Sequence, residues 1–493
     1  MNAALLIIGL TMAGALALGL RAGRGREMTL EQWSVGGRGF GTIFVFLLLA
    51  GEIYTTFTFL GASGYAYGRG APTYYILGYG CLAYILSYWL LPLIWRYAKD
   101  NRLISQSDFF SRKYDSPTLG VVVSLVGLIA LVPYLVLQLK GLGIIVAAAG
   151  YGAVSSTTAI WVGAAVVTAY VMASGVRGSA WTAVVKDVMI LAIVVFLGLY
   201  LPIHYYGGLT DMFQAIDAAK PGFLALPPKG ESAWWFASTV LLTALGFFMW
   251  PHSFASVFTA REAQVFRRNA IVLPLYQLIM LFVFFVGFAA ILQVPGLQGP
   301  EIDLALVRLS VKTFSPWMVG VIGATGVLTA LVPGSMILMT AATLLANNIY
   351  RLAHPSAGDR HIVRVAKSLV PVVALIAVYF TLAGGQHIVA LLLMGYSFVT
   401  QLFPALVLCL TKSRWATPAG AAAGIVTGVA AVAAISLTHT TIATLFPALP
   451  VAVQELNVGL LALAVNVIVL VVVSAAERLA TARQHVAEKH ASS

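Results

Sequence analysis

The stretch FLLLAGEIYTTFTFLGASGYAYG (residues 46–68) is apolar enough to enter a membrane, yet its middle does not suit an unbroken membrane helix. Gly51 and Glu52 interrupt the apolar run, and three threonines follow them. A second stretch, LLTALGFFMWPHSFASVFTAR (241–261), carries Pro251 at a comparable depth. Proline removes a backbone donor and clashes with the preceding turn, and irregular backbone survives at membrane depth only where it is buried in protein or lines a cavity. The two stretches predict two broken helices, although isolated Gly and Pro also occur in ordinary membrane helices.

The whole chain is apolar. Of its 493 residues, 60% are hydrophobic and 9% are charged, and the mean hydropathy is +0.92. A soluble globular chain carries about a quarter charged residues, and the apolar runs have the length that a helix needs to cross a bilayer. We therefore expect an all-α, polytopic membrane protein with about thirteen transmembrane helices. The expected spans are roughly 2–20, 40–67, 73–96, 118–149, 156–175, 180–203, 234–258, 269–293, 316–349, 367–384, 387–411, 417–438 and 455–475.

The positions of the two broken helices predict an internal repeat. When the first span is set aside as an anchor, the breaks fall in the first and sixth of the remaining spans, which run in opposite directions. Inverted repeats of five helices, with solute bound at the breaks, would give this spacing. The expected parts are an anchor helix and cytoplasmic loop (1–39), a first repeat (40–205), a periplasmic loop (206–233), a second repeat (234–412), two further helices (413–476) and a cytoplasmic tail (477–493).

The net charge of +12 could suggest a nucleic-acid partner, but the distribution of the basic residues favours a membrane topology instead. If the N-terminus faces outward, 22 Lys and Arg residues fall on the inner side. The outward loops then hold five, which are Arg69, Lys220, Lys229, Arg308 and Lys312. This asymmetry is typical of bacterial membrane proteins. The arginines follow the first span, unlike those of a cleaved signal peptide. We expect an inner-membrane protein with a periplasmic N-terminus and a cytoplasmic C-terminus.

Several stretches resemble the sodium–solute symporter family, which includes the proline permease, the pantothenate permease and the sodium–glucose transporters. They are WSVGGRGFG (33–41), ASGYAYGRG (62–70), GVRGSAWTAVVKD (175–187), WPH (250–252), FTAREAQVFRRNA (258–270), NNIYR (347–351), FPALVLCL (403–410) and WATPAGAAAGIVTG (415–428). The resemblance implies the leucine-transporter fold and ion-coupled symport of a solute. Two strings, LAGEIYTTFTFLGASG (49–64) and PYLVLQLKGLGIIV (133–146), look most like the monocarboxylate permease branch.

The resemblance also implies a solute site at the two breaks. Carried over residue by residue, the substrate-binding candidates are Thr55, Thr56, Tyr134, Gln138, Trp250, His252, Ser253 and Tyr396. Tyr134 and Gln138 are four residues apart and share a helix face. His252 adjoins the proline and needs a partner at this depth, which an anionic solute could supply. The alternative is that Trp250 and Tyr396 only pack, and that the threonines bond their own backbone.

Ion coupling is where the sequence departs from the family. The family holds sodium with carbonyls of the first broken helix and with two adjacent hydroxyl residues in the 316–349 span. Here those positions are Val332 and Pro333, which offer no side-chain oxygen to a hard cation. The carboxylate that often follows the Trp-Thr pair is replaced by Ala183. Ser335 and Thr340, with Thr343, are a fallback cation site or packing residues, so no metal site is certain.

Ionisable residues inside the predicted spans offer a second route to coupling, because such residues are costly and usually functional. They are Glu52, Lys140 and the neighbours Lys186 and Asp187. Glu52 lies at the first break, where desolvation would favour a proton carrier. Lys186 and Asp187 are about 100° apart on a helix, so they can neutralise each other only by reaching sideways. The alternative is a static ion pair of either lysine with Glu52 or Asp187. The ion-coupling candidates are thus Glu52, Asp187, Lys140, Ser335 and Thr340, with sodium or a proton as the coupling ion.

The sequence therefore predicts a secondary-active symporter for a small organic solute, such as a short monocarboxylate. The alternatives are a transporter-like solute sensor, or a symporter for an amino acid such as proline or alanine, or for pantothenate. An enzyme is not expected, since no metal-binding His-Glu cluster, Ser-His pair or acidic pair with a recognisable context occurs. No channel filter motif occurs either. We expect no cofactor, and no partner other than the solute and the lipid bilayer.

Overall fold

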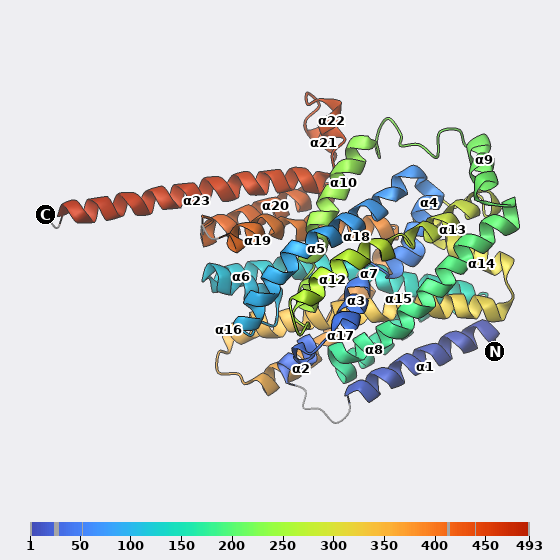
Figure 1. The fold of residues 1–493 in the computed structure, drawn as a ribbon, viewed down its shortest axis with the longest axis horizontal. Coiled ribbons are helices and arrows are strands. Elements are labelled where there is room, and N and C mark those ends of the chain that lie inside the picture. The colour runs from blue at the N-terminus through green and yellow to red at the C-terminus, as the bar shows by residue number, and fades with distance from the viewer. Residues whose placement is uncertain (1, 24–28, 52, 412–414, 439, 492–493) are drawn as a thin grey trace.

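The computed structural model describes residues 2–23, 29–51, 53–411, 415–438 and 440–491, and these form one bundle of helices (Figure 1). Within these ranges no strand forms, apart from an isolated bridge between Phe40 and Ala260. The predicted all-α architecture is confirmed.

Ten helical stretches in the described part of the chain are long and apolar enough to cross a membrane. They are α1 (Ala3–Gly23), α5 (Tyr75–Asp100), α7 (Pro117–Ala149), α8 (Ser156–Tyr206), α12 (Gln264–Gln277) with α13 (Met280–Gln293), α15 (Pro316–Thr343), α17 (Asp359–Ala383), α18 (Ile388–Val399) with α19 (Phe403–Leu410), α20 (Pro418–Thr438) and α23 (Val458–Ala491). Short helices lie between them, namely α2 (Leu30–Val35), α6 (Gln106–Tyr114), α9 (Leu209–Ala219), α14 (Ala305–Thr313), α16 (Arg351–Ala353), α21 (Ile442–Leu445) and α22 (Val451–Gln454).

The predicted count of thirteen is approximate, and the bends explain the difference from ten. α8 contains two expected spans, 156–175 and 180–203, which are joined through Gly175 with φ 60° and ψ −165°. This backbone conformation is essentially restricted to glycine. The two broken helices are each built from shorter pieces, so neither is among the ten long helical stretches.

The first predicted break is confirmed. α3 (Thr42–Gly51) ends at its glycine, residues 53–55 form a turn, and the chain continues as a π-helix, Phe57–Ala62, and then as α4 (Ser63–Arg69). π-helical turns are rare and often occur at functional sites. Glu52 lies outside the described residues.

The second predicted break is confirmed as well. α10 (Ala233–Gly246) passes through a 3-10 turn to Trp250, which is extended (φ −61°, ψ 129°). α11 (Pro251–Val257) then begins at its proline and is bent from the preceding helix by 57°. Proline keeps the residue before it out of the helical region and suits the first position of a helix, so it ends one helix and begins the next.

The two broken helices run in opposite directions, as predicted. Phe40, just before α3, donates its N–H to Thr259 O (3.0 Å) and accepts from the N–H of Arg261 (3.0 Å), just after α11. The first broken helix therefore begins at the side of the bundle where the second one ends.

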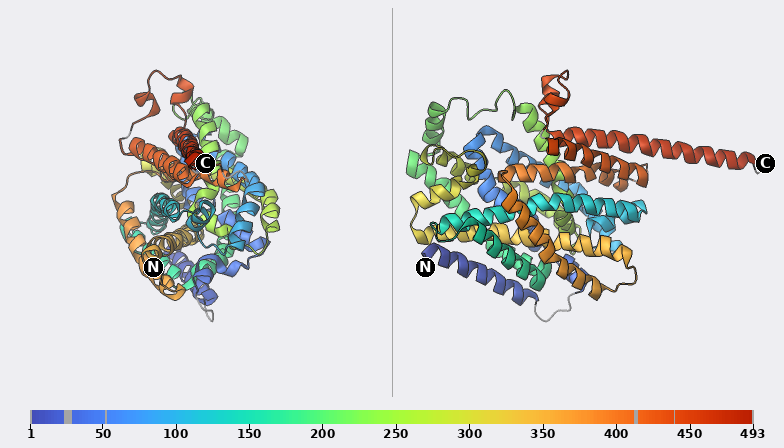
Figure 2. Two further views of the ribbon diagram at one scale, coloured as in Figure 1. Left: turned by 90° about the vertical axis from the view of Figure 1, so that its left-hand side faces the viewer. Right: turned by 180° about the vertical axis from the view of Figure 1, so that it is seen from behind.

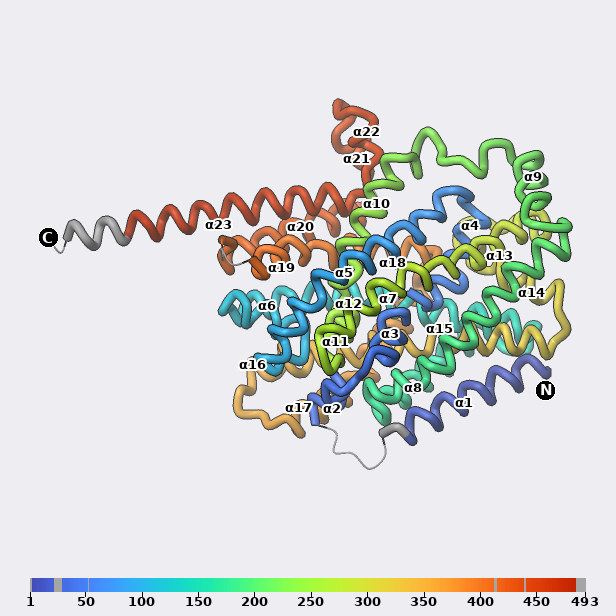
Figure 3. The backbone as a smooth tube through the Cα atoms, in the orientation of Figure 1, coloured from blue at the N-terminus to red at the C-terminus, as the bar shows by residue number. Residues whose placement is uncertain are grey.

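α15 forms the centre of the bundle. It is almost entirely buried and packs against α1, α7 and α8, and the backbone tube shows α1 running along α8 (Figure 3). α7 approaches the first break so closely that a Cβ on Gly141 would lie 1.8 Å from Cγ2 of Thr56. Any larger residue at position 141 would push α7 away from the break.

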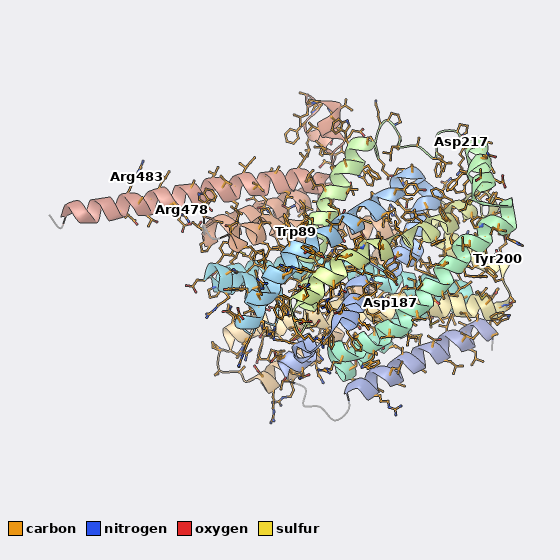
Figure 4. All side chains as sticks on the ribbon, viewed as in Figure 1. Trp89, Asp187, Tyr200, Asp217, Arg478 and Arg483 are labelled. Atoms are coloured by element: carbon orange, nitrogen blue, oxygen red, sulfur yellow. The ribbon has the colours of Figure 1, made fainter. Side chains whose placement is uncertain are left out.

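The C-terminal helix is longer than the expected last span. α23 continues through the predicted tail as one helix and projects far beyond the bundle (Figures 1 and 2). The run SAAERLATARQHVAEKHA contains no proline or glycine and is rich in good helix formers, so nothing ends the helix at the membrane edge. Arg478 and Arg483 lie on this projecting part, whereas Asp187 lies inside the bundle (Figure 4).

Candidate functional site at the helix breaks

Aromatic side chains from three helices surround the second break. The ring of Tyr134 on α7 lies 4.7 Å from Trp250 and 5.2 Å from His252 between centroids. Trp250 lies 5.3 Å from Tyr396 on α18. All four side chains are buried. The structure thus brings together four of the predicted substrate-binding residues, although they come from distant parts of the sequence.

The first break contributes polar groups to the same region. The N–H of Thr56 donates to Oε1 of Gln138 on α7 (3.4 Å). Among the described residues, Nε2 of Gln138 and Oγ1 of Thr56 are buried without a hydrogen-bond partner. A buried polar group that is left unbonded costs free energy, so such groups are candidates for contact with a bound ligand.

Two further predicted residues are buried at the breaks. Thr55 accepts the N–H of Phe57 through Oγ1 (3.1 Å), so the alternative of a local backbone bond holds for this threonine. Ser253 is buried in α11, one residue after His252.

The space between the breaks is nearly closed. A cavity of about 10 Å³ is lined by Leu47, Leu48, Gly51, Ala183, His252, Val332, Pro333 and Met336. A cavity of this size has room for about one water molecule. The residues that the sequence associated with sodium thus face the same cavity as His252, but they line it with apolar groups.

Lys186 and Asp187, neighbours on α8, form an ion pair with 2.9 Å between Nζ and Oδ1. This is the alternative in which Lys186 pairs with Asp187, and the long lysine side chain reaches sideways to its neighbour to make the contact. Nζ of Lys186 also donates to the carbonyl oxygen of Tyr54 in the first break (3.2 Å). Both side chains are buried.

Two of the three fallback hydroxyl groups on α15 donate hydrogen bonds within the protein. Oγ of Ser335 donates to Val332 O (2.6 Å) and lies 2.8 Å from Oγ of Ser179 on α8. Thr343 donates to Met339 O (2.8 Å). Thr340 and Thr343 line a second cavity of about 10 Å³, next to Pro251. The hydroxyls of Ser335 and Thr343 are therefore bonded to different neighbours along α15.

Lys140 is paired with a residue that the sequence analysis missed. Its Nζ contacts Oδ2 of Asp303 at 2.7 Å and donates to Gln386 O at 2.7 Å. Asp303 also accepts the N–H of Ile388 (3.0 Å). Burial raises the pKa of Asp303, and Lys140 opposes this effect. The alternative that Lys140 pairs with Asp187 is not what the structure shows, and the alternative with Glu52 falls outside the described residues. The available signal was the run EIDLALV (301–307), in which Asp303 lies among apolar residues two positions after Glu301.

A second acidic residue was also missed, on the side of the bundle where NNIYR lies. Oδ1 of Asp108 accepts from the side-chain amides of Asn347 (3.1 Å) and Asn348 (2.6 Å). Oδ2 accepts from the N–H groups of Ile104 and Ser105, which forms a capping box on α6. Burial raises the pKa of Asp108, and these hydrogen bonds oppose it. The Ser-x-x-Asp spacing at 105–108 is a capping signal in the sequence.

Comparison with known proteins agrees with this geometry. The chain matches the model of the sodium:solute symporter family over residues 33–428. It is 63% identical over 480 residues to a Bacillus subtilis (strain 168) protein described as "Uncharacterized symporter YhjB", with 97% of this chain and 98% of that one covered. It is 31% identical over 409 residues to the "Monocarboxylate transport permease protein" of Rhizobium johnstonii (strain DSM 114642 / LMG 32736 / 3841), with 80% of each covered.

Solved structures give the fold. The chain superposes on a Na+-coupled sialic acid symporter in a substrate-bound outward-open state with a TM-score of 0.79 at 15% sequence identity. The match covers 96% of this chain and 98% of that one. At this identity the likeness concerns the fold alone, which is the predicted leucine-transporter fold.

Proposed function

Because the chain belongs to the sodium:solute symporter family, we propose that it takes up a short monocarboxylate or a related small organic acid across the bacterial inner membrane. A sodium or proton gradient drives the uptake by alternating access. The chain is a multi-pass membrane protein with a transporter fold. The N-terminus faces the periplasm and the C-terminus the cytoplasm in this proposal.

The observation that carries the proposal is the pairing of buried polar groups with aromatic walls at the breaks. Nε2 of Gln138 is a donor without a partner among the described residues, and Oγ1 of Thr56 can donate as well. A carboxylate is an acceptor for both. Tyr134, Trp250 and Tyr396 supply the apolar walls that a small organic acid needs for its carbon atoms. A relative at 31% identity that is described as a monocarboxylate transport permease supports the same class.

Uptake into liposomes tests the proposal. The purified chain is reconstituted, and labelled lactate, pyruvate, acetate, alanine, proline and pantothenate are offered under an imposed gradient. We expect accumulation of at least one short monocarboxylate, with competition among the members of that class. Binding of a solute without any movement across the membrane would favour a sensor. Accumulation of proline or pantothenate alone would assign another solute class.

A further inference from the structure

A cavity of about 690 Å³ lies where α5, α6 and α19 end and α20 begins. It is lined by Tyr97 and by residues 112–115, 408–411 and 416–418, none of which belongs to a helix break. α6 and α19 are neighbours at the end of the bundle from which α23 projects (Figure 1). In the orientation proposed above, this end faces the cytoplasm. The cavity is therefore separate from the candidate solute site and has the size of a small-molecule site, about 300–1,000 Å³.

The cavity lies at the boundary of the membrane. The spanning stretch Ala71–Asp100 ends just after Tyr97, the stretch Ile388–Leu410 ends in the cavity wall, and the stretch Pro418–Thr438 begins there. Side chains at the ends of membrane helices lie at the depth of the lipid headgroups, where tyrosine is common. The wall thus combines apolar groups of α19 with polar groups of α6 at headgroup depth.

Two basic side chains of α6 line this cavity without a counterion. Neither Arg112 nor Lys113 forms an ion pair with a described residue. Nε of Arg112 donates to Oδ1 of Asn101 (3.4 Å), and the two terminal nitrogens have no hydrogen bond within the described part of the chain. Nζ of Lys113 lies 4.0 Å from the centre of the Tyr97 ring. This cation–π contact holds the ammonium at the wall but leaves its charge uncompensated.

The charges of the described lining do not cancel. Asp115 is the acidic residue among them, so Arg112 and Lys113 leave an excess of one positive charge. The general excess of basic residues on this side follows from membrane topology, but topology does not require two of them to line one cavity. A ligand with one negative charge at headgroup depth would complement this lining.

The walls of the cavity are held in place by hydrogen bonds between the helices. The hydroxyl of Tyr114, at the end of α6, donates to Ala405 O on α19 (2.7 Å). The N–H of Thr417, at the start of α20, donates to Oγ of Ser474 on α23 (3.1 Å). A ligand would therefore meet walls that are already in position, which lowers the entropic cost of binding.

We propose that this cavity binds the headgroup of an anionic phospholipid, with its phosphate on Arg112 and Lys113. A guanidinium offers a phosphate two parallel N–H donors, and an ammonium adds a point charge. The acyl chains lie along the apolar surface of α19, where Val407 is exposed. Basic pockets between membrane helices on the cytoplasmic side suit anionic headgroups for this reason. The inference goes beyond the proposed function, because it involves no solute.

The test measures lipid binding to the purified full chain after delipidation in a neutral detergent. The probes are phosphatidylglycerol and phosphatidylcholine with identical acyl chains, and native mass spectrometry counts the bound lipid. We expect phosphatidylglycerol to bind about tenfold more tightly or better, because hydrogen bonds to charged groups contribute about 1.5–3 kcal/mol. The double variant Arg112→Gln with Lys113→Gln should lose this preference. Arg364→Gln with Lys367→Gln removes the same charge from α17, outside the cavity, and should bind as the parent chain does.

Two further variants keep the test valid if the glutamine variant does not fold. Arg112→Lys with Lys113→Arg retains both charges and should retain most of the binding. Asp115 has a left-handed backbone (φ 49°), which asparagine tolerates well. Asp115→Asn should therefore fold, and it should strengthen the binding of phosphatidylglycerol by about two- to fivefold, the usual effect of one exposed charge.

Equal affinity for the two lipids would overturn the inference, and so would unchanged binding in the glutamine variant or no gain in Asp115→Asn. An equal loss in the α17 control would make the effect one of total surface charge, which also contradicts the proposed site. Full competition by millimolar inorganic phosphate would assign the cavity to a free phosphate compound and not to a lipid. Failure of solute uptake, by contrast, would refute the proposed function and leave these binding results standing.

Discussion

Lys140 on α7 and Asp303 in the 3-10 turn Gly299–Leu304 form an ion pair with 2.7 Å between Nζ and Oδ2, although 163 residues separate them in the sequence. The Asp303 side chain is fully buried, and that of Lys140 is 20% exposed. The pair also bonds the backbone at Gln386 and Ile388. The pair therefore links α7, the turn Gly299–Leu304 and the segment 386–388, in the half of α7 that is farther from its N-cap Ser116.

The first prediction tests the energetic role of this pair. Asp303→Asn leaves a partly buried ammonium without its counterion, and we expect a loss of stability of about 3 kcal/mol, since breaking a buried pair costs about 3–5 kcal/mol. Adding Lys140→Met should recover part of the loss. Thermal unfolding in detergent measures both effects. Asp359→Asn is the matched control, because the Arg351–Asp359 pair is exposed and should contribute less than about 1 kcal/mol. Equal effects of the two single variants would refute this assignment.

The second prediction concerns pH. Burial, with Arg69 and Lys140 nearby, lowers the pKa of His387 to about 4. The fold therefore favours the neutral imidazole, whose Nδ1 accepts the N–H of Ala390 at the start of α18. This contribution is fully present above about pH 6.5, the ordinary pKa of histidine, and it is lost as the pH falls toward about 4.

His387→Asn separates the titration from the cap, because asparagine is a good N-cap but does not titrate. We expect the variant to lose less stability than the parent chain between about pH 6.5 and pH 4. Thermal unfolding across this range gives the comparison, with His361→Asn on α17 as the control that should retain the parent profile. An unchanged profile in His387→Asn would show that another group dominates the acid response.

The third prediction concerns His252, which follows the proline of the second break. His252→Ala should weaken solute binding about tenfold or more, because a hydrogen bond to a charged group contributes about 1.5–3 kcal/mol. Binding to the purified protein measures this, and the amount of folded protein in the membrane should change much less. His361→Ala removes a histidine that bonds Tyr350 far from the breaks and should bind solute normally. Normal affinity in well-folded His252→Ala would remove this residue from the site.

The fourth prediction compares two buried glutamines. Nε2 of Gln138 has no partner among the described residues, and Oε1 makes one long hydrogen bond, from the N–H of Thr56 (3.4 Å), so Gln138→Leu should weaken solute binding more than it lowers stability. Nε2 of Gln401 donates to Ser397 O and Gly459 O, so Gln401→Leu should mainly lower stability. Binding and thermal unfolding, measured on both variants, distinguish the two roles. A Gln138→Leu variant that is unstable yet binds with full affinity would make Gln138 a packing residue.

The fifth prediction concerns topology. Because basic residues concentrate on one side of the predicted membrane, the C-terminus should lie in the cytoplasm. A reporter fused after Ser493 that is active only in the cytoplasm should give full signal, and one that is active only in the periplasm should give none. The opposite result would reverse the assigned orientation.

Much of this protein follows from its sequence by physical rules that act locally. Apolar runs of membrane length must become helices, because lipid offers no partner for backbone groups. Pro251 disfavours a continuous helix because it removes a backbone donor and clashes with the preceding turn, although Pro92, Pro133 and Pro333 lie inside helices of the same protein. The two breaks, the all-α architecture and the grouping of Tyr134 and Gln138 on one helix face were therefore predictable.

Only the tertiary structure decided which charged groups meet. Several acidic residues were possible ion-pair partners of Lys140. No periodicity in the sequence indicates that Lys140 contacts a residue 163 positions away. For Lys186 the sequence left a pair with Asp187 as one alternative among several, because helix geometry describes where a side chain starts and not where a long, flexible one ends. The pairing of charges depends on how α7, α8 and the breaks pack against one another. That packing is set by contacts between distant segments, so the charge pairs emerge from the fold and not from any single stretch of sequence.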